Sequence, residues 1–414
     1  MPHRFPLQDN KIVTENRTVA LVEPMWVRGH YETQMYLFLS ILLPKNCRLM
    51  VLCAEPEKVK EWAAAILPDM QNKLFTAHFS LIDDPGREKL KTGQAWPYLS
   101  ESLHKAEEAS GWNIDMVFIN SLDIIIYGNR RAWFSKRNFD YPWAGLYVTP
   151  VFRLKRNSRR NIKRFIQLQI FKGVKNCQGI AILDEGTYRK SQAYFKDRQV
   201  FVFPDVTDER LPSPLPDKFN KIKEKAGSRT IIGMVGLLQK RKGWLNFLRA
   251  IPAMDPEKCF FLTAGYLHLP DYTAEEQLEI DRLMTSLEGT NRHFELDYID
   301  DPAEVNAYIA LCDMVYLCYE NFYYSSGIMT KAASLNKFMV VTEGYCMGER
   351  VEKYGLGLTV KEGDLNDIIA ALTTLSDIET REEMMLKANF NKYMAFHNER
   401  KLDTVLSEIV GVDM

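Results

Sequence analysis

Short apolar runs alternate with helix-like segments along the first half of the chain. The apolar runs are bounded by turn residues and cover positions 18–23, 48–53, 116–120, 144–148 and 180–183. Between them, segments such as residues 31–43 and 58–66 carry apolar side chains at helical spacing. Short, continuous apolar runs are typical of strands that are covered on both faces. The pattern therefore predicts βαβ units and a parallel sheet.

The same alternation restarts in the second half of the chain, after a break. Residues 204–228 contain four prolines among many charged side chains, which is typical of an interdomain linker. Further strands are expected at residues 230–235, 260–264, 294–296, 314–317 and 338–342. The predicted fold class is α/β, with two Rossmann-like domains, residues 1–203 and 229–388, whose parallel sheets face a central cleft. Ligands of open α/β sheets bind at such a cleft, which favours an enzyme or a ligand-binding protein.

The composition excludes several classes of protein. The 414 residues include 53 Lys and Arg against 54 Asp and Glu, so the chain as a whole is not built for nucleic acid. No stretch approaches the roughly 20 apolar residues of a membrane span, and residues 1–17 lack the apolar core of a signal peptide. The seven cysteines form no CxxC pair. We therefore expect reduced thiols, no metal site and a cytoplasmic protein.

A basic turn between a strand and a helix is the first candidate site. The strand expected at 230–235 ends at Gly236, and a basic cluster that finishes with Lys242 precedes Gly243, which opens a helix. A glycine after a strand lets the backbone approach a ligand closely, and a lysine there neutralises phosphate oxygens. A plain strand–turn–helix with a solvated turn is the alternative. The segment is not a GxGxxG fingerprint, which argues against a nicotinamide oxidoreductase.

A second candidate site lies directly before a helix in the second domain. Ser325, Ser326 and Gly327 precede a segment with apolar side chains at helical spacing. Serine is a favoured N-cap, and the free N–H groups of a helix N-terminus bind anions such as a diphosphate. An ordinary capped helix is the alternative.

Taken together, these segments resemble the group 1, family-4-like glycosyltransferases of the GT-B fold. Their order and spacing are similar to the family's glycine–lysine turn, aspartate-led strand, glutamate loop, following helix and strand, and glycine-rich tail. The matching positions are Gly236, Lys242, Gly243, Asp313, Glu320, Asn321, Phe322, 331–334, 338–341, Gly344, Glu349 and 354–357. The resemblance covers about residues 229–365 and is only architectural over the first half of the chain.

The resemblance implies a glycosyltransferase that moves a sugar from a nucleotide sugar, with UDP favoured, to a saccharide, lipid-linked or small-molecule acceptor. It also implies that the anomeric configuration is retained and that the transfer needs neither a metal ion nor a cofactor. It also implies that the C-terminal helix, residues 389–414, crosses back to the first domain.

Roles for individual residues follow from the same resemblance. Gly236 and the three amides at 325–327 are expected to approach the diphosphate, while Lys242 counters its charge. Lys242 and Glu320, which stands near the family's first glutamate, are expected to take part in catalysis. The residues expected to bind the donor are Gly29, Gly236, Lys242, Tyr298, Ile299, Ser325, Ser326, Gly327 and Lys331. Tyr298 and Ile299 are expected at the base.

Three departures from the family pattern keep a second function open. Leu237 replaces the family's arginine, Tyr323 falls where its first glutamate is expected, and Lys331 replaces its second glutamate. A lysine cannot accept hydrogen bonds from hydroxyl groups, although it can pair with a phosphate. The alternative function is therefore a non-catalytic GT-B protein that binds or regulates a partner.

The first domain offers further candidates at the expected cleft. The family places a glycine-rich loop after the first strand, where Gly29 and His30 stand in this chain. His30 is expected to orient an acceptor hydroxyl, to take part in catalysis or to donate to a phosphate, with a structural histidine as the alternative. Asp123 follows the strand at 116–120 and is expected to contact acceptor hydroxyls, with a turn-capping aspartate as the alternative.

Residues 153–172 form one more unusual segment, with eight basic residues and no acidic one. Ile162, Phe165, Ile166 and Ile170 share one side of the expected helix. A basic amphipathic helix suits an anionic membrane surface or an anionic acceptor. We therefore expect possible peripheral contact with the inner face of a membrane, with an ordinary solvated helix face as the alternative. A single basic patch in a chain of near-zero net charge argues against nucleic acid.

Overall fold

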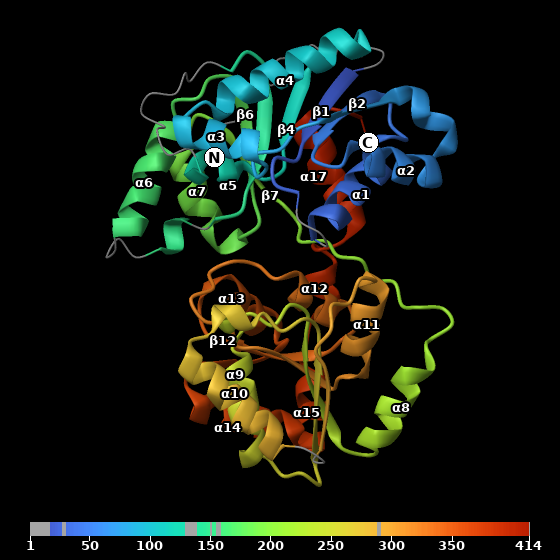
Figure 1. Ribbon diagram of the computed structural model, residues 1–414, viewed down its shortest axis with the longest axis vertical. Coiled ribbons are helices and arrows are strands. Elements are labelled where there is room, and N and C mark those ends of the chain that lie inside the picture. Colours follow the sequence, from blue (N-terminus) through green and yellow to red (C-terminus); the bar gives the residue numbers. More distant parts are fainter. Residues whose placement is uncertain are drawn as a thin grey trace, which may run out of the picture.

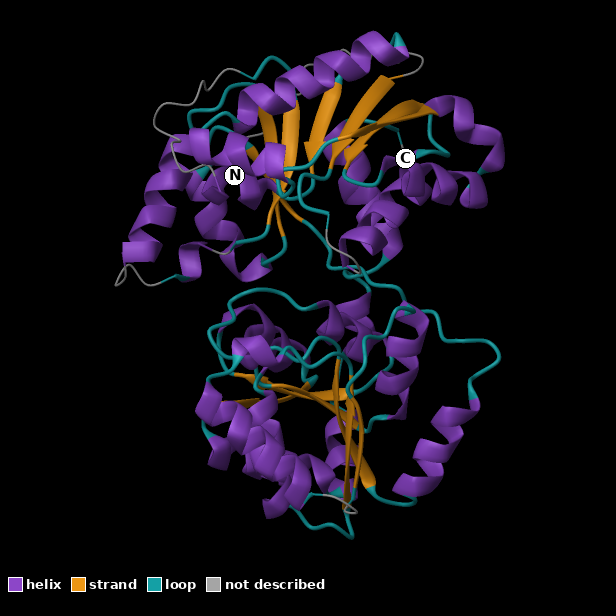
Figure 2. Cartoon of the chain, viewed as in Figure 1, coloured by secondary structure: helices purple, strands orange, loops and turns teal. Residues whose placement is uncertain are grey.

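The computed structural model describes residues 17–26, 30–128, 139–149, 151–154, 159–287 and 291–413. Within these residues the chain forms two α/β domains, each built on one parallel sheet (Figures 1 and 2). Figure 2 shows the two groups of strands one beyond the other along the long axis, each surrounded by helices. The predicted fold class, α/β with two Rossmann-like domains, is confirmed.

The first sheet has the strand order β3-β2-β1-β4-β5-β6-β7 in the described part of the chain. Its strands are β1 (Arg17–Val22), β2 (Cys47–Cys53), β3 (Leu74–His78), β4 (Met116–Ile119), β5 (Trp143–Tyr147), β6 (Cys177–Ile182) and β7 (Gln199–Val202). Its helices are α1 (His30–Leu42), α2 (Pro56–Ile66), α3 (Asp84–Thr92), α4 (Ala95–Ser110), α5 (Leu122–Gly128), α6 (Arg159–Phe171) and α7 (Tyr188–Tyr194). The central strands β1, β2 and β4 are almost wholly buried, which explains their continuous apolar sequences.

The second sheet has the order β10-β9-β8-β11-β12-β13, again within the described residues. Its strands are β8 (Thr230–Val235), β9 (Cys259–Ala264), β10 (Arg292–Glu295), β11 (Met314–Leu317), β12 (Phe338–Thr342) and β13 (Gly357–Val360). The helices of this half are α8 (Asp217–Ala226), α9 (Trp244–Ala250), α10 (Ala274–Ser286), α11 (Pro302–Leu311), α12 (Gly327–Ser334), α13 (Tyr345–Tyr354), α14 (Leu365–Ser376), α15 (Ile378–Met385), α16 (Phe390–Met394) and α17 (Glu399–Val410).

The strands that the sequence pattern did not predict are β3, β7 and β13, and all three lie at the edge of a sheet. Their side chains are mostly half-buried or exposed, unlike those of the central strands. An edge strand packs against fewer neighbours, so its sequence is under less pressure to be continuously apolar. The short apolar run that marks a central parallel strand is therefore weak in these three segments.

Each sheet has one point at which the strand order reverses. In the first sheet this point lies between β1 and β4, and in the second sheet between β8 and β11. The chain leaves adjacent strands toward opposite sides there, which opens a crevice beyond their carboxyl ends. The residues that follow these four strands are therefore the first place to look for a ligand site.

The connections between the domains differ in detail from the predicted boundaries. The expected linker, residues 204–228, contains α8, whose Phe219, Ile222 and Ala226 pack into the core of the second domain. At the other end of the chain, α17 lies among elements of the first domain (Figure 1), and its apolar face packs on that domain's core. The chain therefore crosses between the domains twice, after β7 and again between α16 and α17.

Two smaller observations concern the cysteines and the helices. All seven cysteines are free thiols, and six of them are buried. Among the described residues, every helix is too short or too polar to cross a membrane.

Candidate functional site

Gly236 lies at the centre of the candidate site, at the reversal point of the second sheet. It follows β8 with φ +102°, a conformation that side-chain-bearing residues rarely adopt. A Cβ at this position would lie 3.5 Å from Cδ1 of Ile328 in α12 and 3.6 Å from Nζ of Lys242. The basic turn and the N-terminal turn of α12, which are far apart in sequence, therefore meet beside bare backbone.

Gly265 reinforces this close packing from the neighbouring strand. It follows β9 with φ +135°, and a Cβ there would lie 2.2 Å from the carbonyl oxygen of Gly236. A side chain at position 265 would clash with the backbone of Gly236, and a side-chain-bearing residue at position 236 would be strained by its φ.

Lys242 places a cation at this surface. It belongs to the short 3₁₀ turn η5 (Lys240–Lys242), and its Nζ lies 5.5 Å from the ring centroid of Tyr319. Burial, together with the nearby charge of Arg241, lowers the pKa of Lys242 to about 8. Lys242 forms no ion pair with any carboxylate in the described part of the chain. An anionic ligand beside it would stabilise the charged form and raise this pKa.

The N-terminus of α12 supplies the second half of the site. Ser326 is the N-cap residue, with an extended backbone and a side chain that makes no capping hydrogen bond to the helix. The N–H groups of Met329 and Thr330 donate to the carbonyl oxygen of Ser326. The N–H groups at the start of the helix, beginning with that of Gly327, have no acceptor within the helix. Together with the helix dipole, they favour the binding of an anion.

The side chain of Ser325 is committed elsewhere. Its hydroxyl donates to a carboxylate oxygen of Asp205 and accepts a hydrogen bond from Arg350. Only the backbone of Ser325 is therefore left to take the expected part in donor binding.

Glu320 lies next to the basic turn, in the loop that follows β11. Its backbone N–H donates to the carbonyl oxygen of Arg241 at 2.7 Å, and its Oε1 accepts a hydrogen bond from Asn246 at 3.0 Å. Burial, and next the charge of Glu362, raise the pKa of the Glu320 carboxyl above its ordinary value. The structure thus brings Glu320 into the same loop cluster as Lys242.

Two residues with unfavourable backbone conformations mark the loops around this site. Asn321 follows β11 with φ +50°, and Tyr345 follows β12 with φ +54°. Non-glycine residues with positive φ store backbone strain and cluster at functional sites. Asn321 is the neighbour of Glu320 in the chain. Tyr345 is the first residue of α13 and packs edge-on against Tyr323, with ring centroids 4.4 Å apart.

Lys331 takes a different role from the expected one. Its Nζ donates to the carbonyl oxygen of Asp208 in the linker at 2.8 Å and to Oδ1 of Asn306 in α11 at 2.7 Å. Burial lowers its pKa to about 8, against the opposing charge of Asp208. Two of its three N–H groups hold protein oxygens, so the structure ties Lys331 to the linker where the sequence suggested a phosphate.

The two residues expected at the base lie in the loop after β10, at the edge of the second sheet. Tyr298 is 53% exposed, so its ring is free to contact a ligand. Ile299 is partly buried against the core of the second domain.

Asp123 corrects the acceptor prediction for the first domain. Its two carboxylate oxygens accept hydrogen bonds from the N–H groups of Val148 at 2.7 Å and Thr149 at 2.8 Å. These bonds tie α5 to the chain that leaves β5, and burial raises the pKa of the carboxyl against their effect. The turn-capping alternative therefore describes Asp123 better than contact with an acceptor. Gly29 and the side chain of His30 lie outside the described residues, although α1 begins at His30.

A residue that the sequence analysis did not select lies at the reversal point of the first sheet. Glu23 follows β1, is fully buried, and accepts hydrogen bonds from the N–H of Met25 at 3.0 Å, the hydroxyl of Ser121 at 2.8 Å and the amide of Asn120. Burial is the largest effect on this carboxyl and raises its pKa to about 7. An acidic residue at the end of an apolar run is the sequence signal by which Glu23 could have been found.

A cluster of charges joins the two domains beside the site. Arg153 donates to Asp184 in its own domain and to both carboxylate oxygens of Glu349 in α13, at 2.6 and 2.7 Å. Arg350 reaches in the opposite direction to Glu185. These contacts bring the loop after β6 against the start of α13, so the carboxyl ends of the two sheets face each other.

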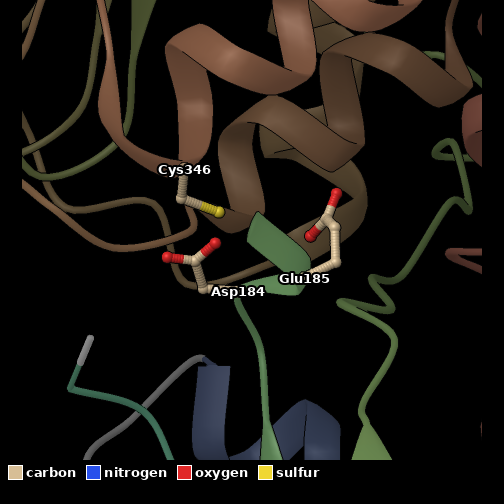
Figure 3. A group of neighbouring side chains, drawn as sticks. All are labelled: Asp184, Glu185 and Cys346. Atoms are coloured by element: carbon tan, nitrogen blue, oxygen red, sulfur yellow. The ribbon is translucent and has the colours of Figure 1, made fainter. Parts of the chain in front are cut away.

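Asp184, Glu185 and Cys346 lie close enough in this cluster to be considered as metal ligands (Figure 3). The Cys346 thiol points toward the Asp184 carboxylate (Figure 3), and burial raises its pKa far above the ordinary value. Arg153 and Arg350 already supply positive charge to the two carboxylates. A metal needs a thiolate and free carboxylate oxygens, so these residues fit a metal poorly.

Comparison with known proteins supports the fold and leaves the sequence family open. No family model matches the chain, and no curated protein matches its sequence.

HepE from Anabaena, in complex with UDP and glucose, has a TM-score of 0.64 and 13% identity, with 96% of this chain and 100% of that chain covered. Sucrose-phosphate synthase from Thermosynechococcus elongatus has a TM-score of 0.66 and 15% identity, with 95% and 98% covered. A glycosyltransferase from Rickettsia africae has a TM-score of 0.57 and 15% identity, with 95% and 98% covered. The chain has the GT-B fold.

Proposed function

We propose that the protein is a glycosyltransferase that moves a sugar from a nucleotide sugar to an acceptor bound in the cleft. The observation that carries this proposal is the meeting of Gly236, Lys242 and the N-terminus of α12 at the reversal point of the second sheet. Bare backbone, a half-buried cation and free helix amides form a site for a diphosphate.

The proposed chemistry depends on the departing nucleoside diphosphate. Negative charge grows on the diphosphate as the bond to the sugar breaks, and the ammonium of Lys242 with the amides of α12 stabilises it without reorganisation. Glu320 lies in the same loop cluster and is proposed to hold sugar hydroxyls. Retention of configuration, and transfer without a metal ion, are part of the proposal and follow from the family resemblance.

The donor nucleotide and the acceptor are proposed more broadly. HepE was crystallised with UDP and glucose, which supports UDP as the first nucleotide to test. The acceptor is proposed to enter from the first domain and to be a saccharide, a lipid-linked sugar or a small molecule.

A thermal-shift panel of UDP, GDP, ADP and their sugars, with and without a divalent metal, tests the proposal. A ligand present at 100 times its dissociation constant adds about 2.7 kcal/mol of stability. For domains of this size that corresponds to a rise in Tm of roughly 5–10 °C. A shift with one nucleotide that does not depend on metal supports the proposal, and the absence of any shift contradicts it.

A non-catalytic GT-B protein is the second candidate function, and the position of Lys331 favours it. A carboxylate that would hold ribose in the family is replaced by a lysine, and two of its three N–H groups are occupied by Asp208 and Asn306. Nucleotide binding without release of UDP, in the presence of a panel of saccharide and lipid-linked acceptors, would support this function over transfer.

We further propose that α6 contacts an anionic membrane surface at the cytoplasmic face. Phe165 packs against the core of the first domain and Ile170 is buried, whereas Ile162 is 46% exposed and Ile166 is 39% exposed, one helical turn apart. The basic side chains of Arg159, Arg160 and Lys163 surround these two and are exposed. Exposed apolar residues within a basic helix face match a surface of anionic lipid.

Sedimentation with phosphatidylserine vesicles at low salt tests this contact. The double variant Ile162→Asp, Ile166→Asp should remain in the supernatant while the wild type sediments. Leu278→Asp is the matched control, because Leu278 is 57% exposed on a helix of the other domain. A wild type that stays in the supernatant at low salt would rule the contact out.

A further inference from the structure

Arg350 of α13 lies where the two domains and the linker meet the loop between β11 and α12, residues 318–326, called the donor-site loop below. Its side chain is only 2% exposed. The guanidinium donates to both carboxylate oxygens of Glu185, over 2.8–3.2 Å, and to the carbonyl oxygen of Leu183 at 2.7 Å. Both acceptors belong to the segment that follows β6, so these bonds join the second domain to the first.

The same guanidinium reaches the loop that leads into α12. It donates to the hydroxyl of Ser325, which in turn donates to Asp205 in the linker. The backbone N–H of Asp205 donates to Nδ1 of His397, in the segment that leads to α17. One arginine therefore contacts the first domain and the donor-site loop directly. It reaches the linker at Asp205 both through Ser325 and by an ion pair at 3.7 Å, and Asp205 connects it to the second crossing at His397.

The geometry requires an arginine. Its planar fork directs separate N–H groups at Glu185, Leu183 and Ser325, whereas a lysine presents one ammonium at the end of a flexible chain. Because the guanidinium is fully desolvated, it is tolerated only while these acceptors stay in place. The acceptors are thereby held at fixed positions relative to one another.

We propose that Arg350 is a positioning residue that fixes residues 325–327 relative to the first domain, so that the placement of the domains sets the geometry of the anion site at α12. This inference rests on the proposed function for the identity of the ligand. It goes beyond that function because it makes a residue outside the site, in contact with neither Gly236 nor Lys242, responsible for the shape of the site.

The adjacent residue of α13 provides a built-in comparison. Glu349 also bridges the domains, through Arg153, but its side chain is 50% exposed and it has no contact with Ser325 among the described interactions. Loss of the Glu349 bridge therefore loosens the contact between the domains while leaving the donor-site loop attached to Arg350.

Hydrogen–deuterium exchange on the ligand-free protein tests the proposal. The variants are Arg350→Lys, Ser325→Ala and Glu349→Gln. Arg229→Lys is the control, since Arg229 donates to the carbonyl oxygens of Ala226 and Lys225, next to the start of β8 and away from the cleft. The amides of Met329 and Thr330, which donate to Ser326, should exchange about tenfold faster in the first two variants and at the wild-type rate in the others.

Ser325→Ala keeps the bond between Arg350 and Glu185, so it remains informative if Arg350→Lys fails to fold. Exchange at the wild-type rate in Ser325→Ala would overturn the proposal, as would equally fast exchange in Glu349→Gln.

Nucleotide binding separates this inference from the proposed function. The dissociation constant for UDP should rise about tenfold in Ser325→Ala, because a loosened helix N-terminus binds an anion less well. If the wild type binds no nucleotide while exchange responds as expected, the proposed function fails and the positioning role stands. If UDP binds equally well to the wild type and to Ser325→Ala, the positioning role fails and the proposed function stands.

Discussion

The ammonium group of Lys331 lies 2.8 Å from the carbonyl oxygen of Asp208, so a helix of the second domain holds the linker by a direct hydrogen bond. Asn306 of α11 completes the contact, since it accepts from Lys331 and donates to the carbonyl oxygens of Asp208 and Arg210. A carboxylate at position 331 cannot donate to these oxygens. Lys331 departs from the family pattern, but its ammonium can donate to these oxygens and so holds the linker of this chain against α12 and α11.

Lys331→Met should destabilise the protein. The variant keeps an unbranched apolar stem but leaves Oδ1 of Asn306 without its donor, and loss of a buried hydrogen-bond partner costs about 1–3 kcal/mol of the free energy of unfolding. Urea denaturation measures the change. Lys392→Met is the control, because Lys392 is exposed on α16, and its effect should stay within about 0.5 kcal/mol. Equal stability of the two variants would show that the contact with the linker contributes nothing.

Lys242→Met should separate ligand binding from stability. The ammonium is half-buried, and partial desolvation lowers its pKa to about 8. Its removal relieves this desolvation cost and should leave the free energy of unfolding unchanged or higher. A hydrogen bond to a charged group contributes about 1.5–3 kcal/mol, so the dissociation constant for the nucleotide should rise roughly tenfold to a hundredfold. Calorimetric titration with UDP measures it.

Lys240→Met is the matched control for this turn. Lys240 pairs with Glu276 of α10 at 2.6 Å, away from Gly236. Loss of this half-exposed pair should cost about 0–1 kcal/mol of stability and leave nucleotide affinity unchanged. The reverse pattern, with affinity lost in Lys240→Met and kept in Lys242→Met, would contradict the assignment of Lys242 to the anion site.

Asp123→Asn should lower stability without changing the response to acceptors. The substituted amide turns an N–H₂ group toward one of the N–H donors of Val148 and Thr149, so one of the two hydrogen bonds is lost at a cost of about 1–3 kcal/mol. Asp84→Asn is the control, because the side chain of Asp84 is 99% exposed. Chemical denaturation checks the stability. A rise in KM for an acceptor without a loss of stability would restore the original acceptor prediction.

The parts of the structure that the sequence predicted are those encoded by local patterns. Apolar runs located the central strands, and the glycine–lysine turn and the serine–glycine N-cap located two segments that meet beside Gly236. In both cases the signal lies within a few residues of the position that it describes. The parallel topology then brings strand ends together without any further information.

What the sequence could not predict are the long-range partners of polar side chains. Lys331 meets the linker 123 positions away, and Arg350 meets Glu185 165 positions away. Each contact depends on how the two domains and the linker are placed, which no periodic pattern encodes. A polar residue next to a cleft also has many possible partners. The sequence therefore predicts contact between Asp123 and an acceptor, whereas in the structure its carboxylate oxygens bind backbone N–H groups.

Glu23 should make the stability of the protein depend on pH in an unusual direction. Burial raises the pKa of this carboxyl from 4.5 in the unfolded chain to about 7 in the folded protein. Between these pH values the folded state binds more protons than the unfolded state, so this group's contribution to stability is complete below pH 4.5 and is lost as the pH rises through 7. One pKa unit corresponds to about 1.4 kcal/mol, so the loss amounts to about 3 kcal/mol.

Glu23→Gln isolates this contribution, because the glutamine does not titrate. Its amide cannot accept from Met25, Ser121 and Asn120 together, so the variant should be less stable than the wild type at pH 4.5. As the pH rises to 8, the wild type should lose about 3 kcal/mol relative to the variant. Urea denaturation of both proteins at several pH values measures the difference, in which the titration of all other groups cancels. A difference that stays constant from pH 4.5 to 8 would show that Glu23 titrates as an ordinary carboxyl, and a difference that grows in favour of the wild type would show that its hydrogen bonds outweigh its burial.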